Sequence, residues 1–405
     1  MLTFKYVARD TATGQKITSE LQAENEQAAT KLVMAQGLTP IEVTLQDNAK
    51  GAGKIFHRVS SKDRILFARQ LSTLINAGLP LLQSLRTVSG QTRSKQFKVI
   101  LNEIIADVEA GSPLNEALAK HPETFNQVFV SLIAAGETSG TLDDSLARIA
   151  VQQEKDAEII RKVRGAMVYP IIVVVVMLGV LGFMIVAVLP QVKVLYDGLG
   201  GNEQLPILTR VLLAVSEFVT KFWWAILIAL IGLAFGMSRW ARTFGGKRFI
   251  DKFKMKAWPI APLFMKMYMA RFSRTGQTLI ASGVPLLQVL DITARSINNV
   301  HIEDSIKVAT VKVKGGKSLS EALKSDPNFL PLVPDMLHIG EESGAVESMM
   351  GKVADYYESE VDQQIKTVST IIEPVLMVML GVVALIIVAA VLLPIYGLAG
   401  KDLTH

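Results

Sequence analysis

Three long apolar runs stand out in the pattern of hydrophobic and polar positions along the chain. Residues 170–190 and 374–394 each form an uncharged run of 21 residues that begins and ends with proline. A helix of that length is about 32 Å long, close to the roughly 30 Å hydrocarbon core of a bilayer. A shorter run over residues 222–238 begins next to Trp223 and Trp224, a position typical of aromatic residues at membrane interfaces. The pattern therefore predicts membrane-spanning helices over residues 169–190, 222–240 and 373–394.

The segments before the first and third runs have the apolar spacing of amphipathic helices, interrupted by glycine and proline. Residues 61–168 and 266–372 are each predicted to form a cytoplasmic bundle of five or six helices. Glycine followed two residues later by proline, at Gly78 and Pro80 and again at Gly283 and Pro285, indicates a turn between two helices. Each bundle is expected to end in one long charged helix that continues into a span.

The two bundles are copies of one unit. Residues 67–85 and 272–290 are identical at 11 of 19 aligned positions, at a constant offset of 205. Both copies end in a span that leaves the cytoplasm, so the run over 222–240, which has no counterpart, must return the chain. The repeats are therefore expected to be parallel rather than inverted.

The N-terminal residues 1–47 alternate between apolar and polar positions in two places and then take helical spacing, which predicts a small ββαβ module. Residues 48–60 are predicted to be a linker. The fold class that follows is a mainly α, polytopic membrane protein with two homologous cytoplasmic helical bundles, three transmembrane helices and an N-terminal α+β module.

Charge orients the spans. Half of the residues are hydrophobic and 20% are charged, with a net charge of +5. Basic residues gather before the first span and after the second, whereas residues 191–221 are balanced. By the positive-inside rule the N-terminus and the linker 241–265 are cytoplasmic, while the segment 191–221 and the tail 395–405 are periplasmic.

Few chemical functions fit the composition. The absence of cysteine excludes disulfides, thiolate metal sites and a cysteine nucleophile. The five histidines are scattered, and no catalytic constellation can be assembled, so an enzyme is not expected and no cofactor is required. The string from Gly315 to Ser318 lacks the first glycine of a phosphate-binding loop and is interpreted as a turn between helices. Basic residues follow the membrane edges, which argues against nucleic acid binding.

A short motif recurs in both copies. Gly136-Glu137-Thr138-Ser139-Gly140 corresponds to Gly340-Glu341-Glu342-Ser343-Gly344. The structural interpretation is a glycine turn in which Ser139 or Ser343 caps the next helix. A metal interpretation is also open, because Glu137 and Asp143 carry the oxygen ligands that Ca²⁺ prefers, although two carboxylates are fewer than it usually takes.

Glu373 and Pro374 lie where the third span begins. An ionisable side chain at the edge of a membrane-spanning helix suggests a functional role for Glu373. The alternative is a hydrated carboxylate just inside the cytoplasm beside a helix-kinking proline. The first copy has Tyr169 and Pro170 there, so the copies are not equivalent.

These motifs in this order resemble the type II secretion F-protein family, which includes the PilC-type platform proteins of type IV pilus assembly. The resemblance rests on Phe67-x-Arg69 with Ala77-Gly78-Leu79-Pro80-Leu81, on the duplicated Gly-Glu-x-Ser-Gly motif and on Ile372-Glu373-Pro374, and it covers essentially the whole chain.

The resemblance implies a non-enzymatic platform in the bacterial inner membrane. Its implied partners are a hexameric cytoplasmic assembly ATPase, pilin or pseudopilin subunits, other inner-membrane assembly proteins and further copies of itself. Some members of the family have calcium at the first cytoplasmic domain. The competing hypothesis from the residues is a transporter built from parallel repeats, which would need polar groups inside the spans.

Overall fold

A computed structural model gives the fold over residues 2–10, 16–23, 26–35, 38–45, 59–191, 194 and 207–399. The chain divides into two compact units, Met1–Val59 and Ser60–His405.

The N-terminal unit contains a three-stranded antiparallel sheet and one helix. In the sheet, β1 lies between β2 and β3. Val33 of the helix packs against Ala8 of the central strand, with Leu38 beside them. The elements in chain order are β1 (Leu2–Asp10), β2 (Lys16–Ala23), α1 (Glu26–Ala35) and β3 (Leu38–Leu45).

The first repeat is a helical bundle built around phenylalanine. Phe67, Phe97, Phe125 and Phe129 are buried and pack ring against ring, with centroid distances from 4.9 to 6.4 Å. Each aromatic ring buries a large apolar area, and buried leucines such as Leu71, Leu101 and Leu132 belong to the same bundle. Its helices are α2 (Ser61–Asn76), α3 (Leu81–Gln91), α4 (Lys95–Glu109), α5 (Leu114–Ala119), α6 (Gln127–Ser139) and α7 (Leu142–Phe183).

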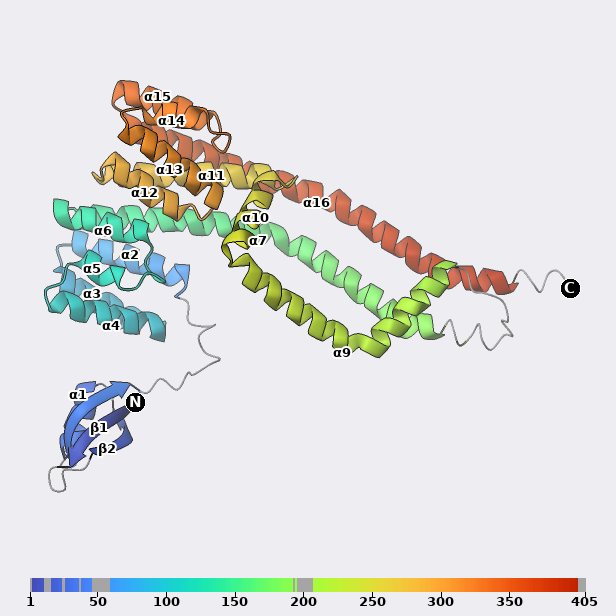
Figure 1. The fold of residues 1–405 in the computed structure, drawn as a ribbon, viewed down its shortest axis with the longest axis horizontal. Coiled ribbons are helices and arrows are strands. Elements are labelled where there is room, and N and C mark those ends of the chain that lie inside the picture. The colour runs from blue at the N-terminus through green and yellow to red at the C-terminus, as the bar shows by residue number, and fades with distance from the viewer. Residues whose placement is uncertain are drawn as a thin grey trace. The chain divides into compact units, whose positions relative to one another are not determined.

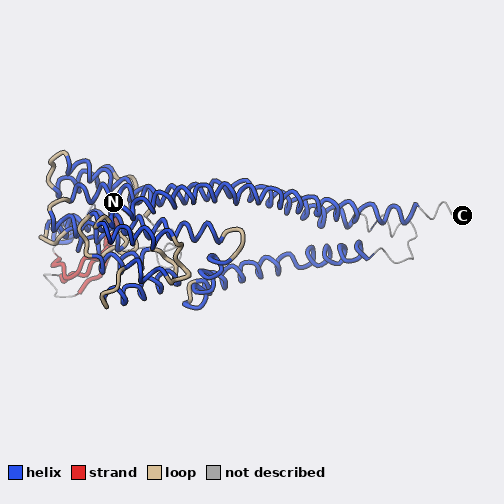
Figure 2. The backbone as a smooth tube through the Cα atoms, turned by 90° about the horizontal axis from the view of Figure 1, so that it is seen from above, coloured by secondary structure: helices blue, strands red, loops and turns tan. Residues whose placement is uncertain are grey.

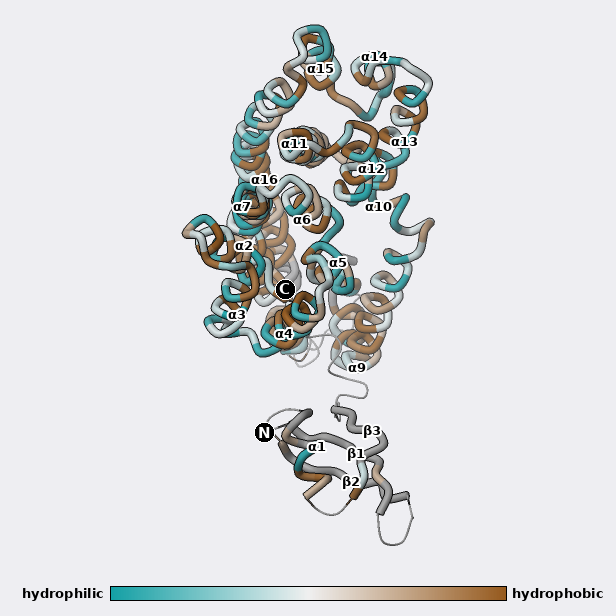
Figure 3. Tube along the Cα trace, turned by 90° about the vertical axis from the view of Figure 1, so that its left-hand side faces the viewer, coloured by the Kyte–Doolittle hydropathy of each residue, from teal (hydrophilic) through white to brown (hydrophobic). Residues whose placement is uncertain are grey.

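The second repeat has the same helices in the same order, and two of the four core positions keep their ring. Phe272 and Phe329 meet edge to face at 5.1 Å, while Ile302 and Val333 occupy the other two positions. Figure 3 shows the helices of this repeat packed around α11. They are α11 (Ala261–Ala281), α12 (Leu286–Ser296), α13 (Val300–Lys314), α14 (Leu319–Lys324), α15 (Leu332–Ser343) and α16 (Val346–Ala399).

The predicted turns are confirmed. Gly78 and Gly283 have φ of 85° and 78°, a left-handed conformation that favours glycine, and the prolines that follow them begin α3 and α12. Residues 315–318 form the turn between α13 and α14, where the Ser318 hydroxyl accepts a hydrogen bond from the amide of Glu321. This geometry supports the interpretation of that string as a helix-helix turn.

The last helix of each repeat continues without a break into an apolar run. The 42 residues of α7 and the 54 residues of α16 correspond to lengths of about 63 Å and 81 Å. A short π-helical segment, η2 (Met184–Val188), extends α7. Figures 1 and 2 show the two helices leaving the bundles in the same direction. Three helices in the described part of the chain are long and apolar enough to cross a membrane, as predicted.

Helix α9 (Ile207–Ala241), which contains the predicted span 222–240, begins earlier than the apolar run. Its first half packs on η2 through Leu213 and Leu189, and the Ser216 hydroxyl donates a hydrogen bond to the carbonyl of Ile185. A kink at Phe222 separates this half from the second. The linker 241–265 contains a further helix that the apolar pattern did not indicate, α10 (Phe244–Lys256).

Candidate coupling interface between the two repeats

The glutamate of the duplicated motif binds the start of a neighbouring helix. The Glu137 carboxylate, near the end of α6, accepts hydrogen bonds from the backbone amides of Leu114 at 2.6 Å and Asn115 at 2.9 Å. These amides open α5 and have no carbonyl partner within their own helix. Pro113, which precedes them, makes no side-chain cap, so Glu137 supplies the missing acceptor from another helix.

Glu341 repeats this arrangement in the second copy. Its carboxylate accepts hydrogen bonds from the amides of Leu319 at 2.6 Å and Ser320 at 3.2 Å, and from the Ser320 hydroxyl. The negative charge also lies at the positive end of the α14 dipole. The duplicated glutamate is therefore a structural clamp between consecutive helices in each bundle.

The glycines of the motif let two helices meet closely. A Cβ atom on Gly136 would lie 2.5 Å from Ser145 Oγ and 3.1 Å from Leu142 Cα of α7, and one on Gly340 would lie 2.9 Å from Val346 Cα of α16. Gly140 and Gly344 then end α6 and α15 with φ of 74° and 71°.

The predicted capping role of the motif serines is wrong. The Ser139 hydroxyl bonds back to the carbonyl of Ala135 at 2.8 Å, and the Ser343 hydroxyl to that of Ile339 at 2.6 Å. Thr141 is the residue that precedes α7, and it makes no side-chain cap. Serine near the end of a helix has this local alternative, because its hydroxyl can reach the carbonyl four residues earlier.

The calcium interpretation of Glu137 and Asp143 stays a prediction. Both Glu137 oxygens already accept amide hydrogen bonds, and Asp143 belongs to the first turn of α7. No group of three or more metal-binding side chains occurs in the described part of the chain. Six to eight oxygens are usual around Ca²⁺, so this geometry favours the structural interpretation of the motif.

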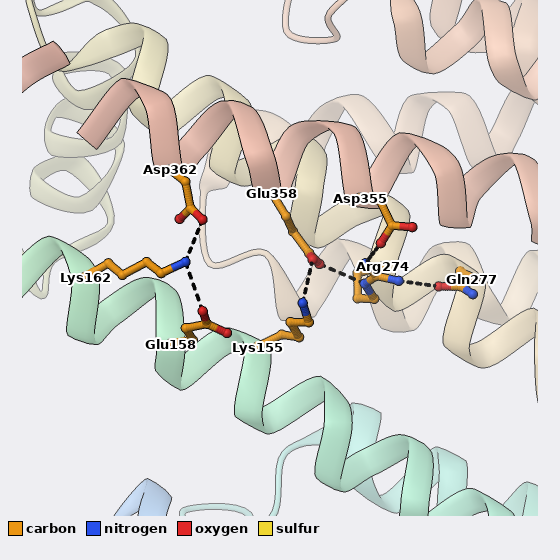
Figure 4. Close-up of polar contacts among 8 residues, drawn as sticks. All are labelled: Lys155, Glu158, Lys162, Arg274, Gln277, Asp355, Glu358 and Asp362. Atoms are coloured by element: carbon orange, nitrogen blue, oxygen red, sulfur yellow. Dashed lines mark hydrogen bonds and ion pairs between the residues drawn. The ribbon is translucent and has the colours of Figure 1, made fainter. Parts of the chain in front are cut away.

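The repeats meet along α7, α11 and α16, and ion pairs join them there. Lys155 on α7 pairs with Glu358 on α16 at 3.5 Å. Lys162, two turns after Lys155 on α7, binds Asp362 of α16 at 2.5 Å (Figure 4). It also pairs with Glu158 of its own helix at 2.9 Å. The hydrogen bond to Asp362 is the main cause that raises the pKa of Lys162. The charged part of α7 is thus fixed to the charged part of α16, outside the predicted spans.

Arg274 of α11 lies at the centre of this interface. It donates hydrogen bonds to Glu358 at 2.8 Å and to Gln277 at 2.9 Å, and it also binds Asp355 (Figure 4). The exposed fractions of Arg274 and Glu358 are 15% and 14%. The corresponding pair in the first repeat, Arg69 with Glu154, has 45% and 44% exposed. The same pair is therefore covered only in the second copy, where residues of α7 lie over it.

Asp156 is the acidic residue that α7 brings to Arg271 of α11, at 3.5 Å. Burial raises its pKa above the ordinary value, and Arg271 acts in the opposite direction. The side chain keeps 39% exposure, so this desolvation is partial. Next to these charges Ile159, Val163 and Ala166 pack on an apolar cluster of Leu263, Val361 and Ile365.

Sequence reasoning did not single out this interface. A usable signal was the spacing of charges on the two long helices, since residues 155, 158 and 162 share one face, as do residues 355, 358 and 362. The motif Glu373-Pro374, which was singled out, lies exposed on α16 beyond the interface. The positions predicted from the duplicated motif are brought together within each bundle rather than at the contact between bundles.

Two family profiles match the chain. The profile described as type II secretion system (T2SS), protein F, matches twice, at residues 67–190 and 272–394, and its N-terminal domain profile matches residues 1–44. The chain belongs to the type II secretion system protein F family. The double match of the protein F profile also confirms the internal duplication.

Curated members of the protein F family align with the chain almost end to end. It is 37% identical over 407 residues to the type IV pilus assembly protein PilC of Thermus thermophilus, covering 99% of each chain. It is 35% identical to PilC of Myxococcus xanthus, covering 96% of this chain and 94% of that one. It is 32% identical to the type II secretion system protein F of Pseudomonas aeruginosa, covering 98% and 99%. The resemblance inferred from the motifs is confirmed.

Proposed function

We propose that this protein is an inner-membrane platform of a type IV pilus or type II secretion machine. Its cytoplasmic repeats engage a hexameric assembly ATPase, and its spans act on pilin or pseudopilin subunits in the bilayer. It works as a homo-oligomer beside other inner-membrane assembly proteins, and it catalyses no reaction itself. The names of its relatives, which come from pilus assembly and from type II secretion, support this assignment.

The observation that carries the proposal is the continuity of α7 and α16 from the bundles into the apolar runs. Each helix belongs to a cytoplasmic core at one end and to a span at the other. Because the ion pairs and the apolar cluster between them bind the two helices to each other, force applied to either bundle reaches both spans. A movement of the ATPase would therefore be transmitted to the membrane without a flexible joint.

The proposed orientation follows the basic residues. The N-terminal unit and both repeats lie in the cytoplasm, and the C-terminal tail lies in the periplasm. A reporter enzyme that is active only in the periplasm should therefore be active when it is fused to the C-terminus. A reporter that is active in the cytoplasm would contradict the orientation and the use of the repeats as an ATPase docking site.

Co-purification tests the proposed partner directly. The full chain should retain the assembly ATPase of the same cell, and a variant without residues 61–168 should lose it. Correct membrane insertion of the shortened variant, and protection of its second repeat from protease, are the required controls. Undiminished retention of the ATPase by that variant would contradict the role of the first repeat.

A further inference from the structure

Helix α10 packs against the end of the second span. Only Arg242 and Thr243 separate it from α9, and the Thr243 hydroxyl accepts a hydrogen bond from the amide of Gly246 at 3.2 Å. A Cβ atom on Gly246 would lie 1.9 Å from the carbonyl oxygen of Trp240. The first turn of α10 therefore touches the last turn of α9, and the direction in which α10 leaves the span is set by this contact.

The inner face of α10 is held by the second repeat. Asp251 is buried, and its carboxylate accepts a hydrogen bond from the amide of Val300 at 3.1 Å, at the start of α13. The next two amides of α13 are capped by Asn299. His301 adds a contact of 3.2 Å from its Nε2 to the carbonyl of Arg248. One face of α10 is thus part of the bundle.

The outer face of α10 combines aromatic and basic side chains. Phe244, Phe249 and Phe253 are exposed to 72%, 61% and 58%. Lys252 and Lys256, which are exposed as well, follow Phe249 and Phe253 by three residues and therefore lie on the same side of the helix, whereas Arg248 pairs with Asp304 of α13 at 3.5 Å. Trp258, exposed to 79%, follows the helix, and the ring of Trp240 packs at a tilt against that of Phe249, with 5.7 Å between the ring centroids. Three exposed phenylalanines on one short helix form an apolar surface of the kind that marks an interaction site.

We propose that this outer face lies in the headgroup layer of the cytoplasmic leaflet and binds anionic phospholipid. Aromatic rings at the boundary of the acyl chains, with Lys and Arg reaching the phosphates, are the composition of interfacial helices. The position of α10 at the end of a membrane-spanning helix puts the face at that depth. Because the inner face is bonded to α13, lipid binding fixes the distance of the second repeat from the bilayer and its orientation relative to the bilayer. The inference rests on the span, not on the proposed ATPase partner.

Because the chain has no cysteine, a single introduced cysteine reports on one site. Gly245 is exposed on α10, and a Cβ atom there meets nothing within 4 Å, so Gly245→Cys preserves every aromatic and basic side chain. A nitroxide on this cysteine, in the full chain reconstituted into vesicles, is probed by collision with oxygen and with a water-soluble nickel chelate. Val311→Cys, on an exposed position of α13, is the control.

In vesicles that contain phosphatidylglycerol, the label at residue 245 should become oxygen-accessible and protected from nickel, while the label at residue 311 remains open to nickel. Lys252→Gln with Lys256→Gln should lower the affinity of this face for phosphatidylglycerol on the order of 25-fold, since each surface cation contributes about fivefold in affinity for an anionic leaflet. The matched pair Lys95→Gln with Lys98→Gln, exposed on α4, removes the same charge and should change nothing.

Raising the salt concentration from about 0.1 M to 1 M shortens the screening length from roughly 10 Å to 3 Å and should reduce the dependence on anionic lipid. A label at residue 245 that stays accessible to nickel in both lipid compositions would overturn the proposal. Protection from nickel that is equal in phosphatidylcholine and phosphatidylglycerol vesicles would overturn the anionic specificity. Equal protection from nickel together with low accessibility to oxygen would place α10 against protein, including a second copy of this chain.

Discussion

Among single residues, Asp156 should make a contribution to stability that depends on pH. Because burial raises its pKa above 3.8, the folded chain binds this proton at a higher pH than the unfolded chain does. The contribution of Asp156 to the free energy of unfolding should therefore increase as the pH falls through the raised pKa, and level off below 3.8. Thermal unfolding of the wild type and of Asp156→Asn in lipid nanodiscs, from neutral to acid pH, measures this difference. A constant difference across that range would be inconsistent with a raised pKa.

Glu158, two residues further along α7, should show the opposite dependence on pH. The hydrogen bond from Lys162 is the main cause that lowers the pKa of Glu158 below 4.5. Its stabilising contribution is present above 4.5 and is lost as the pH falls through the lowered pKa. The free energy of unfolding of Glu158→Gln should therefore approach that of the wild type as the pH falls. That of Asp156→Asn should instead decrease relative to the wild type.

The clamp glutamates make a local prediction. Glu137→Gln keeps the size of the side chain but replaces one acceptor oxygen with an amide group that cannot accept the second backbone hydrogen bond. A part-buried amide without its partner costs about 1–3 kcal/mol. Hydrogen exchange of the full chain should increase around residues 114–119, and Glu341→Gln should produce the same increase around residues 319–324 only. Exchange that is unchanged in both variants would exclude the clamp.

At the scale of helices, the crossing of α6 with α7 depends on the small size of Gly136. Gly136→Ala places a methyl group 2.5 Å from Ser145 Oγ and must push the helices apart, which should cost about 1–3 kcal/mol. Gly90→Ala is the matched control, because a methyl group in that part of α3 meets nothing within 4 Å and should be neutral or stabilising by about 0.5–1 kcal/mol. The melting temperatures of the two variants should move in opposite directions.

The helical repeats were predictable because their signals are local. A glycine two residues before Pro80 or Pro285 is a turn signal that the sequence shows directly, and in the structure both glycines have positive φ. The start of α9 at Ile207 was missed because the apolar pattern does not show the tertiary contacts of its first half, where Leu213 packs against Leu189 and Ser216 bonds to the carbonyl of Ile185. The role of Glu137 was missed for the same reason, since its partners are 22 and 23 residues away. Helix α10 was taken for a linker because its basic residues hide a weak apolar pattern.

Across the whole second unit, α7 and α16 link two helical cores to two apolar runs, and the contact between the repeats joins these two helices. Several ion pairs of this contact are partly exposed, and each contributes on the order of 1 kcal/mol or less. The apolar cluster of Val361 and Ile365 with Ile159 contributes alongside them. A few charge substitutions should therefore be enough to weaken the interface.

A charge exchange between α7 and α16 tests this account most directly. Lys162→Glu places a carboxylate against Asp362 and Glu158, and Asp362→Lys added to it restores an attractive pair. In cells that depend on this chain for pilus assembly or secretion, the single variant should insert and retain the ATPase but assemble markedly fewer filaments, and the double variant should recover. Filament assembly at the wild-type level in the single variant, or no recovery in the double variant, would contradict mechanical coupling through this interface.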